Sequence, residues 1–231
     1  MDLSELELAK ENAFQLVTLV ILIDFEGHIP HGDTSLNETR FSKLREFVFP
    51  AGARKTRVPM VIVSSHSYDI YHAKILEIEA MVKQETKEGR GHVQWITIDP
   101  EYPYKITDII NMVNEQGRSK DQKHKFKIRP NTPQSPIIIG GCNTTGCVAI
   151  SRGYSALNCA KEGLYTQILL PMCADYQVSG ISTADKHMEA FSQLYQMIKY
   201  EKLTEYIDIA MEPTMINFEN IEDANWMKEN E

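Results

Sequence analysis

The chain has 231 residues, of which 42% are hydrophobic and 24% are charged. This composition is typical of a folded globular protein, and it excludes the disordered, fibrous and membrane-spanning classes. The formal net charge of −8 is opposite in sign to that of most nucleic-acid binders, so we expect no nucleic-acid partner.

The residues near the N-terminus and the positions of the cysteines predict the cellular compartment of the protein. The first residues, MDLSELELAKEN, are acidic, whereas a signal peptide begins basic and then becomes apolar. The longest apolar run, residues 16–24, is much shorter than the roughly 20 residues that a membrane helix needs. The four cysteines lie between residues 142 and 173, unlike the spread-out staples of a small secreted scaffold. We therefore predict a cytoplasmic protein with free thiols and no membrane partner.

The hydrophobic pattern predicts strands that alternate with helices along the chain. Runs of β-branched and other apolar residues predict strands over 16–24, 58–64, 93–98, 136–141, 165–170 and 205–209. Apolar residues at helical spacing, or small-residue segments, predict helices over 41–48, 74–87, 145–160 and 183–200, with a short helix capped by Thr107 or Asp108 and ending near Val113. The polar, basic segment 117–133 lacks a period and is interpreted as a loop.

This alternation is typical of an α/β fold, a three-layer α/β/α arrangement around a mostly parallel six-stranded, Rossmann-like sheet. We predict one domain over residues 1–211, followed by an acidic C-terminal tail over 212–231. Ligands of such sheets bind beyond the carboxyl ends of the strands. Asp24, Ser65, His66, the residues after Ile98 and the segment after Gly141 are therefore expected to converge.

The segment after the fourth predicted strand reads GCNTTGCV. Its two glycines match the start of a nucleotide-binding P-loop, but Cys147 and Val148 stand where that loop needs Lys and Ser or Thr. A cysteine in the first turn of a helix lies among unpaired N–H groups, which stabilise a thiolate and can hold an oxyanion. Cys147 is thus a candidate nucleophile. The alternative is that it packs inertly between helix and sheet.

Asp24 ends the first apolar run, and a carboxylate at that point needs a partner. It suits a general base that takes a thiol proton and returns it to a leaving group. The alternative role for Asp24 is to cap a neighbouring loop or helix.

With these residues, the chain resembles the isochorismatase-like cysteine hydrolases, which include nicotinamidases and carbamoyl-amide hydrolases. The family shares an apolar strand that ends in Ile-Asp, here Ile23-Asp24, and a later Gly-x-x-Thr-x-x-Cys-Val motif, here Gly141 to Val148. The likeness extends from about residue 16 to residue 200, and it includes the segment ADKHMEA at 184–190.

The resemblance implies a catalytic triad whose third member is a lysine after the third strand, and Lys105 matches it best in position. The match departs from the family because Ile106-Thr107-Asp108 follow, where members often have a stretch such as Ser-Ala-Phe. In the alternative, Lys105 is an ordinary surface lysine. The resemblance also implies a cis peptide bond between Cys142 and Asn143, which turns the N–H of Asn143 toward an oxyanion beside the N–H of Cys147.

Two further features bear on ligands. His66, Tyr68 and His72 occupy the region where nicotinamidases bind zinc, but two of the three ligands are altered, so we expect no metal and no cofactor. His66 and Thr144 are instead candidate substrate contacts. The basic stretch 118–129 is interpreted as a solvated loop.

The predicted function is cleavage of a C–N bond in a small amide or carbamoyl substrate through a covalent acyl-enzyme, in a protein that resembles a family of homo-oligomers. Two alternatives stay open, a degenerate member that binds a small molecule or protein without turnover, and a hydrolase of a non-amide bond such as a vinyl ether. The helix N-terminus and Lys105 are expected to lower the pKa of Cys147. An ionised Asp24 opposes them, so that the resting state is a neutral thiol.

Overall fold

The computed structural model describes residues 15–25, 34–49, 59–65, 72–87, 92–117, 126–142, 144–174 and 183–210. The predicted tail 212–231 and the first 14 residues lie outside this range. The strands are β1 (Gln15–Ile23), β2 (Met60–Ser65), β3 (Val93–Ile98), β4 (Phe126–Ile128), β5 (Ile137–Cys142), β6 (Thr166–Ala174) and β7 (Ile207–Ala210). The helices are α2 (Thr34–Val48), α3 (His72–Lys87), α4 (Ile106–Gln116), η1 (Thr144–Ser151), α5 (Ala156–Lys161) and α6 (Thr183–Tyr200).

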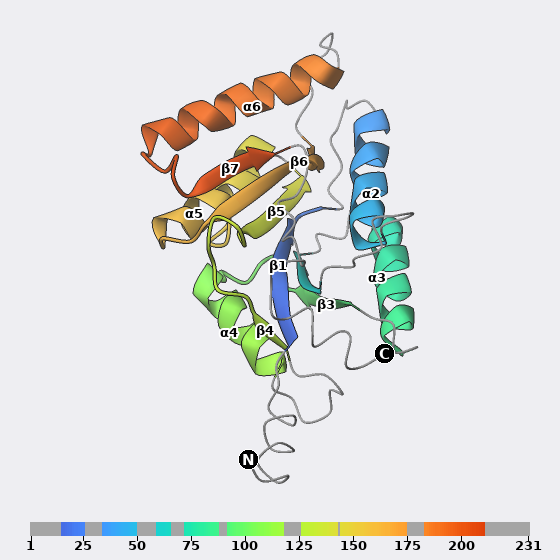
Figure 1. Ribbon diagram of the computed structural model, residues 1–231. Helices are drawn as coiled ribbons and strands as arrows, with labels where there is room; N and C mark the ends of the chain where they lie inside the picture. The colour runs from blue at the N-terminus through green and yellow to red at the C-terminus, as the bar shows by residue number, and fades with distance from the viewer. Residues whose placement is uncertain are drawn as a thin grey trace, which may run out of the picture.

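The strands form one sheet in the order β3-β2-β1-β5-β6-β7, and every neighbouring pair is parallel (Figure 1). Apart from β4 and β5, successive strands are joined through helices, which cover both faces of the sheet. The predicted three-layer α/β/α fold with a mostly parallel sheet is therefore confirmed.

Strand β1 lies at the centre of the sheet, and two strands share one of its edges. Its first residues, Gln15 to Val17, pair with β4, and its last residues, Val20 to Ile23, pair with β5. The prediction of an uninterrupted loop over 117–133 is thus wrong. Three residues within a polar, basic stretch are too few to show the alternation that identifies a strand.

The two faces of the sheet bury separate hydrophobic cores. Ile21, Ile23 and Val63 pack on one face beneath α4, η1, α5 and α6. Val20, Leu22 and Ile62 pack on the other face beneath α2 and α3. Because β1 is apolar on both faces, its sequence is a continuous apolar run rather than an alternating one.

The predicted helix over 145–160 is two helices. The first, η1, is π-helical and ends at Ser151, and the second, α5, begins at Ala156. Between them the backbone N–H of Ser155 donates to the carbonyl of Arg152 in a tight turn. The small-residue composition of this segment gave no sign of the break, although the break decides where Arg152 lies.

The start of α4 also differs from the prediction. Its cap is Lys105, whose backbone N–H donates to the carboxylate of Asp108 at 2.8 Å. Asp108 therefore lies inside the first turn, where its negative charge is favourable, rather than at the cap itself.

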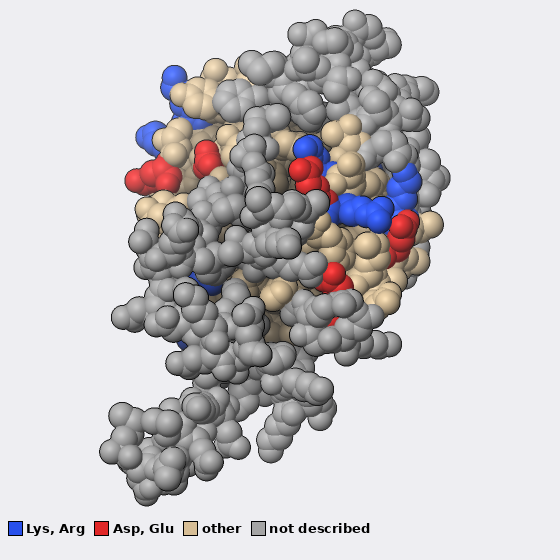
Figure 2. Space-filling view, turned by 45° about the vertical axis from the view of Figure 1, so that its right-hand side comes forward, with Lys and Arg blue, Asp and Glu red and all other residues tan. Residues whose placement is uncertain are grey.

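The outer face of α2 and α3 carries charges of both signs. Figure 2 shows acidic and basic side chains side by side on the described part of this face. Lys43 pairs with Glu46 at 3.0 Å, and Lys83 pairs with Glu79 at 2.6 Å. Within the described residues, none of the helices is long and apolar enough to cross a membrane.

Candidate active site

Asp24 comes directly after β1 and has a positive φ of 45°. Its backbone N–H donates to the hydroxyl of Ser65, at the end of neighbouring β2, over 3.0 Å. Aspartate is one of the few residues that enter the left-handed region readily. The buried hydrogen bond from the adjacent strand therefore fixes an unusual turn that carries the carboxylate.

Cys147 is the fourth residue of η1, which follows β5 on the opposite edge of β1 from β2. The strands β5 and β1 approach closely here, because a Cβ at Gly141 would collide with the carbonyl of Ile23. The chain fills one side of β1 with β2 and β3 before it crosses to β5 on the other side. Asp24 and Cys147 thus flank the topological switch point, where open parallel sheets bind their ligands.

The Cys147 thiol is half-buried, and its pKa is raised to about 11. Burial is the largest cause, followed by the negative charge of Asp24 and by the hydrogen bond between the thiol and this carboxylate. The positive charge of Arg152 lowers the pKa, but by less. The expected lowering of the Cys147 pKa is therefore wrong, since burial and Asp24 outweigh the favourable cation. With its pKa raised in this way, the Cys147 thiol is neutral in the resting protein.

Arg152 is a charged residue of the candidate site that the sequence did not predict. Its Nη2 lies 2.8 Å from Oδ2 of Asp24, and its Nη1 donates to the carbonyl of Pro100 over 2.9 Å. The guanidinium thus joins the ends of β1 and β3 to the turn that follows η1. The one available signal was its place in the sequence, an arginine five residues after the candidate nucleophile and directly before Gly153.

The remaining polar groups of the site are buried beside Asp24. Oδ1 of Asp24 is buried and accepts no hydrogen bond of full geometry within the described part of the chain. Tyr154 is 1% exposed, and burial raises its pKa, an effect partly offset by the neighbouring hydroxyl of Ser65. Thr144, a predicted substrate contact, is buried at the start of η1.

Lys105 lies at the start of α4 and is exposed. The groups that influence the pKa of Cys147 include Asp24, Arg152 and Cys142. The backbone of Lys105 nevertheless lies close to the site, because a Cβ at Gly153 would touch its Cα. The catalytic role of Lys105 stays a prediction.

Several predicted residues lie outside the described range. These are His66, Tyr68 and Asn143, and with Asn143 the predicted cis bond after Cys142. Among the residues that are described, no group of three His, Cys, Asp or Glu side chains could hold a metal ion. The four cysteines are free thiols.

Comparison with known proteins finds a likeness in structure. No family model matches the chain, and no curated protein matches its sequence. YcaC from Pseudomonas aeruginosa, solved with hexane-2,5-diol and covalent acrylamide, superposes with a TM-score of 0.46 at 13% sequence identity, over 83% of this chain and 75% of that one. At so low a similarity, the chemistry of the site rests on its own geometry.

Proposed function

We propose that this protein is a cysteine hydrolase that cleaves a C–N bond in a small amide or carbamoyl substrate. The observation that carries the proposal is the contact between the Asp24 carboxylate and the Cys147 thiol at the switch point of the sheet. A thiol needs a base to become a strong nucleophile, and a carboxylate within hydrogen-bonding reach can serve as that base.

The reaction begins with a neutral thiol. Asp24 takes the proton as the sulfur of Cys147 attacks the substrate carbonyl, and the carbonyl electrons move to the oxygen. Backbone N–H groups of Cys147 and Asn143 are proposed to hold this oxyanion. Asp24 then returns the proton to the leaving amine, the C–N bond breaks, and an acyl-enzyme remains. A water molecule, deprotonated by Asp24, releases the acid and restores the thiol.

The raised pKa of Cys147 favours this sequence over one that begins from a resting thiolate. The protein chain supplies nucleophile, base and oxyanion donors, so the proposed reaction uses no cofactor. We further propose a cytoplasmic protein, consistent with its free thiols, that acts as a homo-oligomer.

The proposal is tested by a screen of small amides and carbamoyl compounds for release of ammonia or amine. Cys147→Ser is expected to lower turnover by at least about a thousandfold while leaving the circular dichroism spectrum unchanged, because serine is hardly ionised near neutral pH. Cys159→Ser, which alters a buried thiol in α5, is the matched control and should keep turnover. Full hydrolysis by Cys147→Ser would overturn the proposal.

A non-catalytic binding role is favoured by one observation, the exposed side chain of Lys105. If the protein only binds its ligand, no compound in the screen will be turned over. Mass spectrometry after treatment with an electrophilic amide would then find Cys147 labelled no faster than Cys142 or Cys173. Turnover of a vinyl ether or ester, lost in Cys147→Ser, would instead identify a hydrolase of another bond.

A further inference from the structure

We propose that Arg152 is the positioning residue of the site, the fixed cation that holds the Asp24 carboxylate in the orientation that receives the Cys147 proton. This inference rests on the proposed function and assigns to Arg152 the electrostatic role that the sequence assigned to Lys105. Four structural observations support it.

The first observation is how the two oxygens of Asp24 are used. Nη2 of Arg152 binds Oδ2 at 2.8 Å, while Oδ1 is buried without a donor of full geometry among the described residues. An oxygen held by a guanidinium is fixed in direction, so the second oxygen is fixed too. The ion pair thereby presents one particular lone pair to the sulfur.

The second observation is that the guanidinium is itself held in place. Its Nη1 donates to the carbonyl of Pro100 at 2.9 Å, in the loop after β3, so the head group bridges two segments. Its side chain is 32% exposed, against 12% for Asp24. An arginine that is partly buried and held by two hydrogen bonds loses little conformational freedom when substrate binds, unlike a mobile lysine on the surface.

The third observation concerns the backbone of Arg152. The side-chain amide of Asn158 donates to the Arg152 carbonyl over 2.7 Å, and the N–H of Ser155 donates to the same oxygen over 2.9 Å. Directly after it, Gly153 packs against the carbonyl of Tyr104, where a Cβ would collide. The turn between η1 and α5 is therefore locked from both sides.

The fourth observation is chemical. An arginine stays charged throughout catalysis. Burial, the largest single influence, lowers the pKa of Arg152, but the hydrogen bond with Asp24 and the charge of that carboxylate help to raise it above its ordinary value. Arg152 therefore cannot exchange protons with the thiol or the leaving group. Asp24 is left as the proton carrier of the pair, and Arg152 acts through it.

The experiment compares Arg152→Met, Arg152→Lys, Lys105→Met and Arg45→Met, the last being an exposed arginine on α2 that serves as a matched control. Two quantities are measured for each variant. One is hydrolysis of a substrate found in the screen. The other, which needs no substrate, is the pH dependence of Cys147 alkylation by iodoacetamide.

We expect Arg152→Met to lower kcat about a hundredfold, because a carboxylate misplaced by about 1 Å loses that much. The pH dependence of Cys147 alkylation should also shift in this variant, and a mere loss of folded protein would not shift it. Arg152→Lys should recover part of both effects by restoring the charge, and this variant keeps the test valid if Arg152→Met is poorly folded. Arg45→Met should match the wild type.

Loss of kcat and a shifted profile in Lys105→Met, with Arg152→Met and Arg152→Lys unchanged, would overturn the inference and return the role to Lys105. Unchanged profiles in both Arg152 variants would overturn it as well. These outcomes differ from failure of the proposed function, in which the wild-type protein itself hydrolyses nothing.

Discussion

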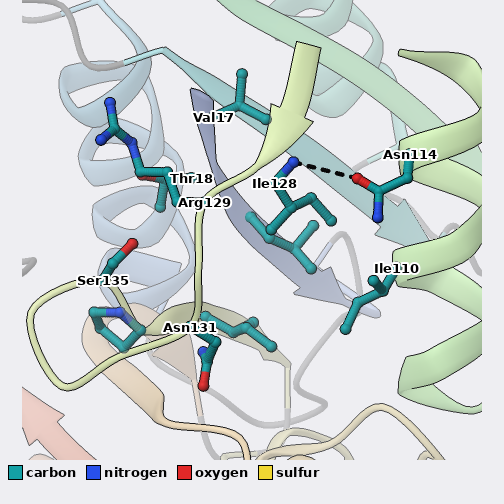
Figure 3. Close-up of a pocket in the computed structure, with 11 residues that line it drawn as sticks. Val17, Thr18, Ile110, Asn114, Ile128, Arg129, Asn131 and Ser135 are labelled. Atoms are coloured by element: carbon teal, nitrogen blue, oxygen red, sulfur yellow. Dashed lines mark hydrogen bonds between the residues drawn. The ribbon is translucent and has the colours of Figure 1, made fainter. Parts of the chain in front are cut away.

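The two ends of the parallel sheet are both rich in polar side chains, but they use them differently. At the amino ends of β1 and β5 lies a cavity of about 180 Å³ that includes Asn114, Asn131 and Ser135 in its lining (Figure 3). Asn114 accepts the N–H of Ile128 at 3.3 Å. Asn131 donates to the carbonyl of Tyr165 at 2.8 Å and accepts its N–H at 2.6 Å.

At the carboxyl ends, the polar groups bind one another and leave capacity unused. Asp24 forms its ion pair with Arg152 through Oδ2, and Nε of Arg152 is buried without a hydrogen-bond partner in the described residues. The asparagine side chains at the amino end complete the hydrogen bonding of the backbone, whereas at the carboxyl end a carboxylate and a guanidinium pair with each other. The presence of a cavity is thus not by itself a guide to chemistry here.

The difference between the two ends of the sheet is tested most directly at Asp24. Asp24→Asn should lower hydrolysis by about a thousandfold, because the general base is lost. The same change should speed alkylation of Cys147 near pH 8, since the charge of Asp24 raises the thiol pKa and its removal lowers it. Kinetics and iodoacetamide labelling measure the two effects. If both rates fall together, the carboxylate has a structural role and the assignment fails.

The second prediction concerns the protonation state of the Cys147 thiol. With a pKa of about 11, Cys147 should be alkylated about ten times faster for each pH unit between pH 7 and pH 10. Cys159, buried in α5 with a pKa raised further by burial, should remain unlabelled and serves as an internal control. A rate that levels off above pH 8 would mean that Cys147 already rests as a thiolate, contrary to the proton transfer described above.

The smallest effect is expected at the opposite end. Asn131→Ala removes both hydrogen bonds to Tyr165, which should lower the free energy of unfolding by about 1–3 kcal/mol. Alkylation of Cys147 and hydrolysis by the folded variant should be unchanged, and urea denaturation gives the stability. A large fall in kcat without loss of stability would mean that the amino-end cavity takes part in the reaction.

Much of the fold could be predicted because buried parallel strands are conspicuous in sequence. The runs around Val20, Ile62 and Ile138 are apolar on both faces, and helix α6 begins and ends where its apolar spacing predicts. Strand β4 could not be predicted in this way, since its three residues lie in a charged stretch and pair through β1 alone.

The candidate site was predictable as far as it follows from strand ends. Asp24 and the segment with Cys147 come together because parallel strands end at one edge of the sheet. Arg152 was not predictable, since its position depends on a helix that stops and turns, a tertiary feature without a composition signal. Lys105 was proposed by resemblance alone, and its catalytic role stays a prediction.

The π-helical form of η1 makes the number of residues between Cys147 and Arg152 as important as their identity. A π-turn holds about one residue more than an α-turn. If η1 closed as an ordinary α-helix with all its residues kept, the five residues from Cys147 to Arg152 would span about 500° of rotation, and Arg152 would lie about 140° round the helix axis from Cys147. The guanidinium would then leave Asp24 even though every charged residue was retained. Related chains should therefore tolerate many substitutions in this segment, provided that the number of residues from the cysteine to the arginine and the helix form that matches it are kept together.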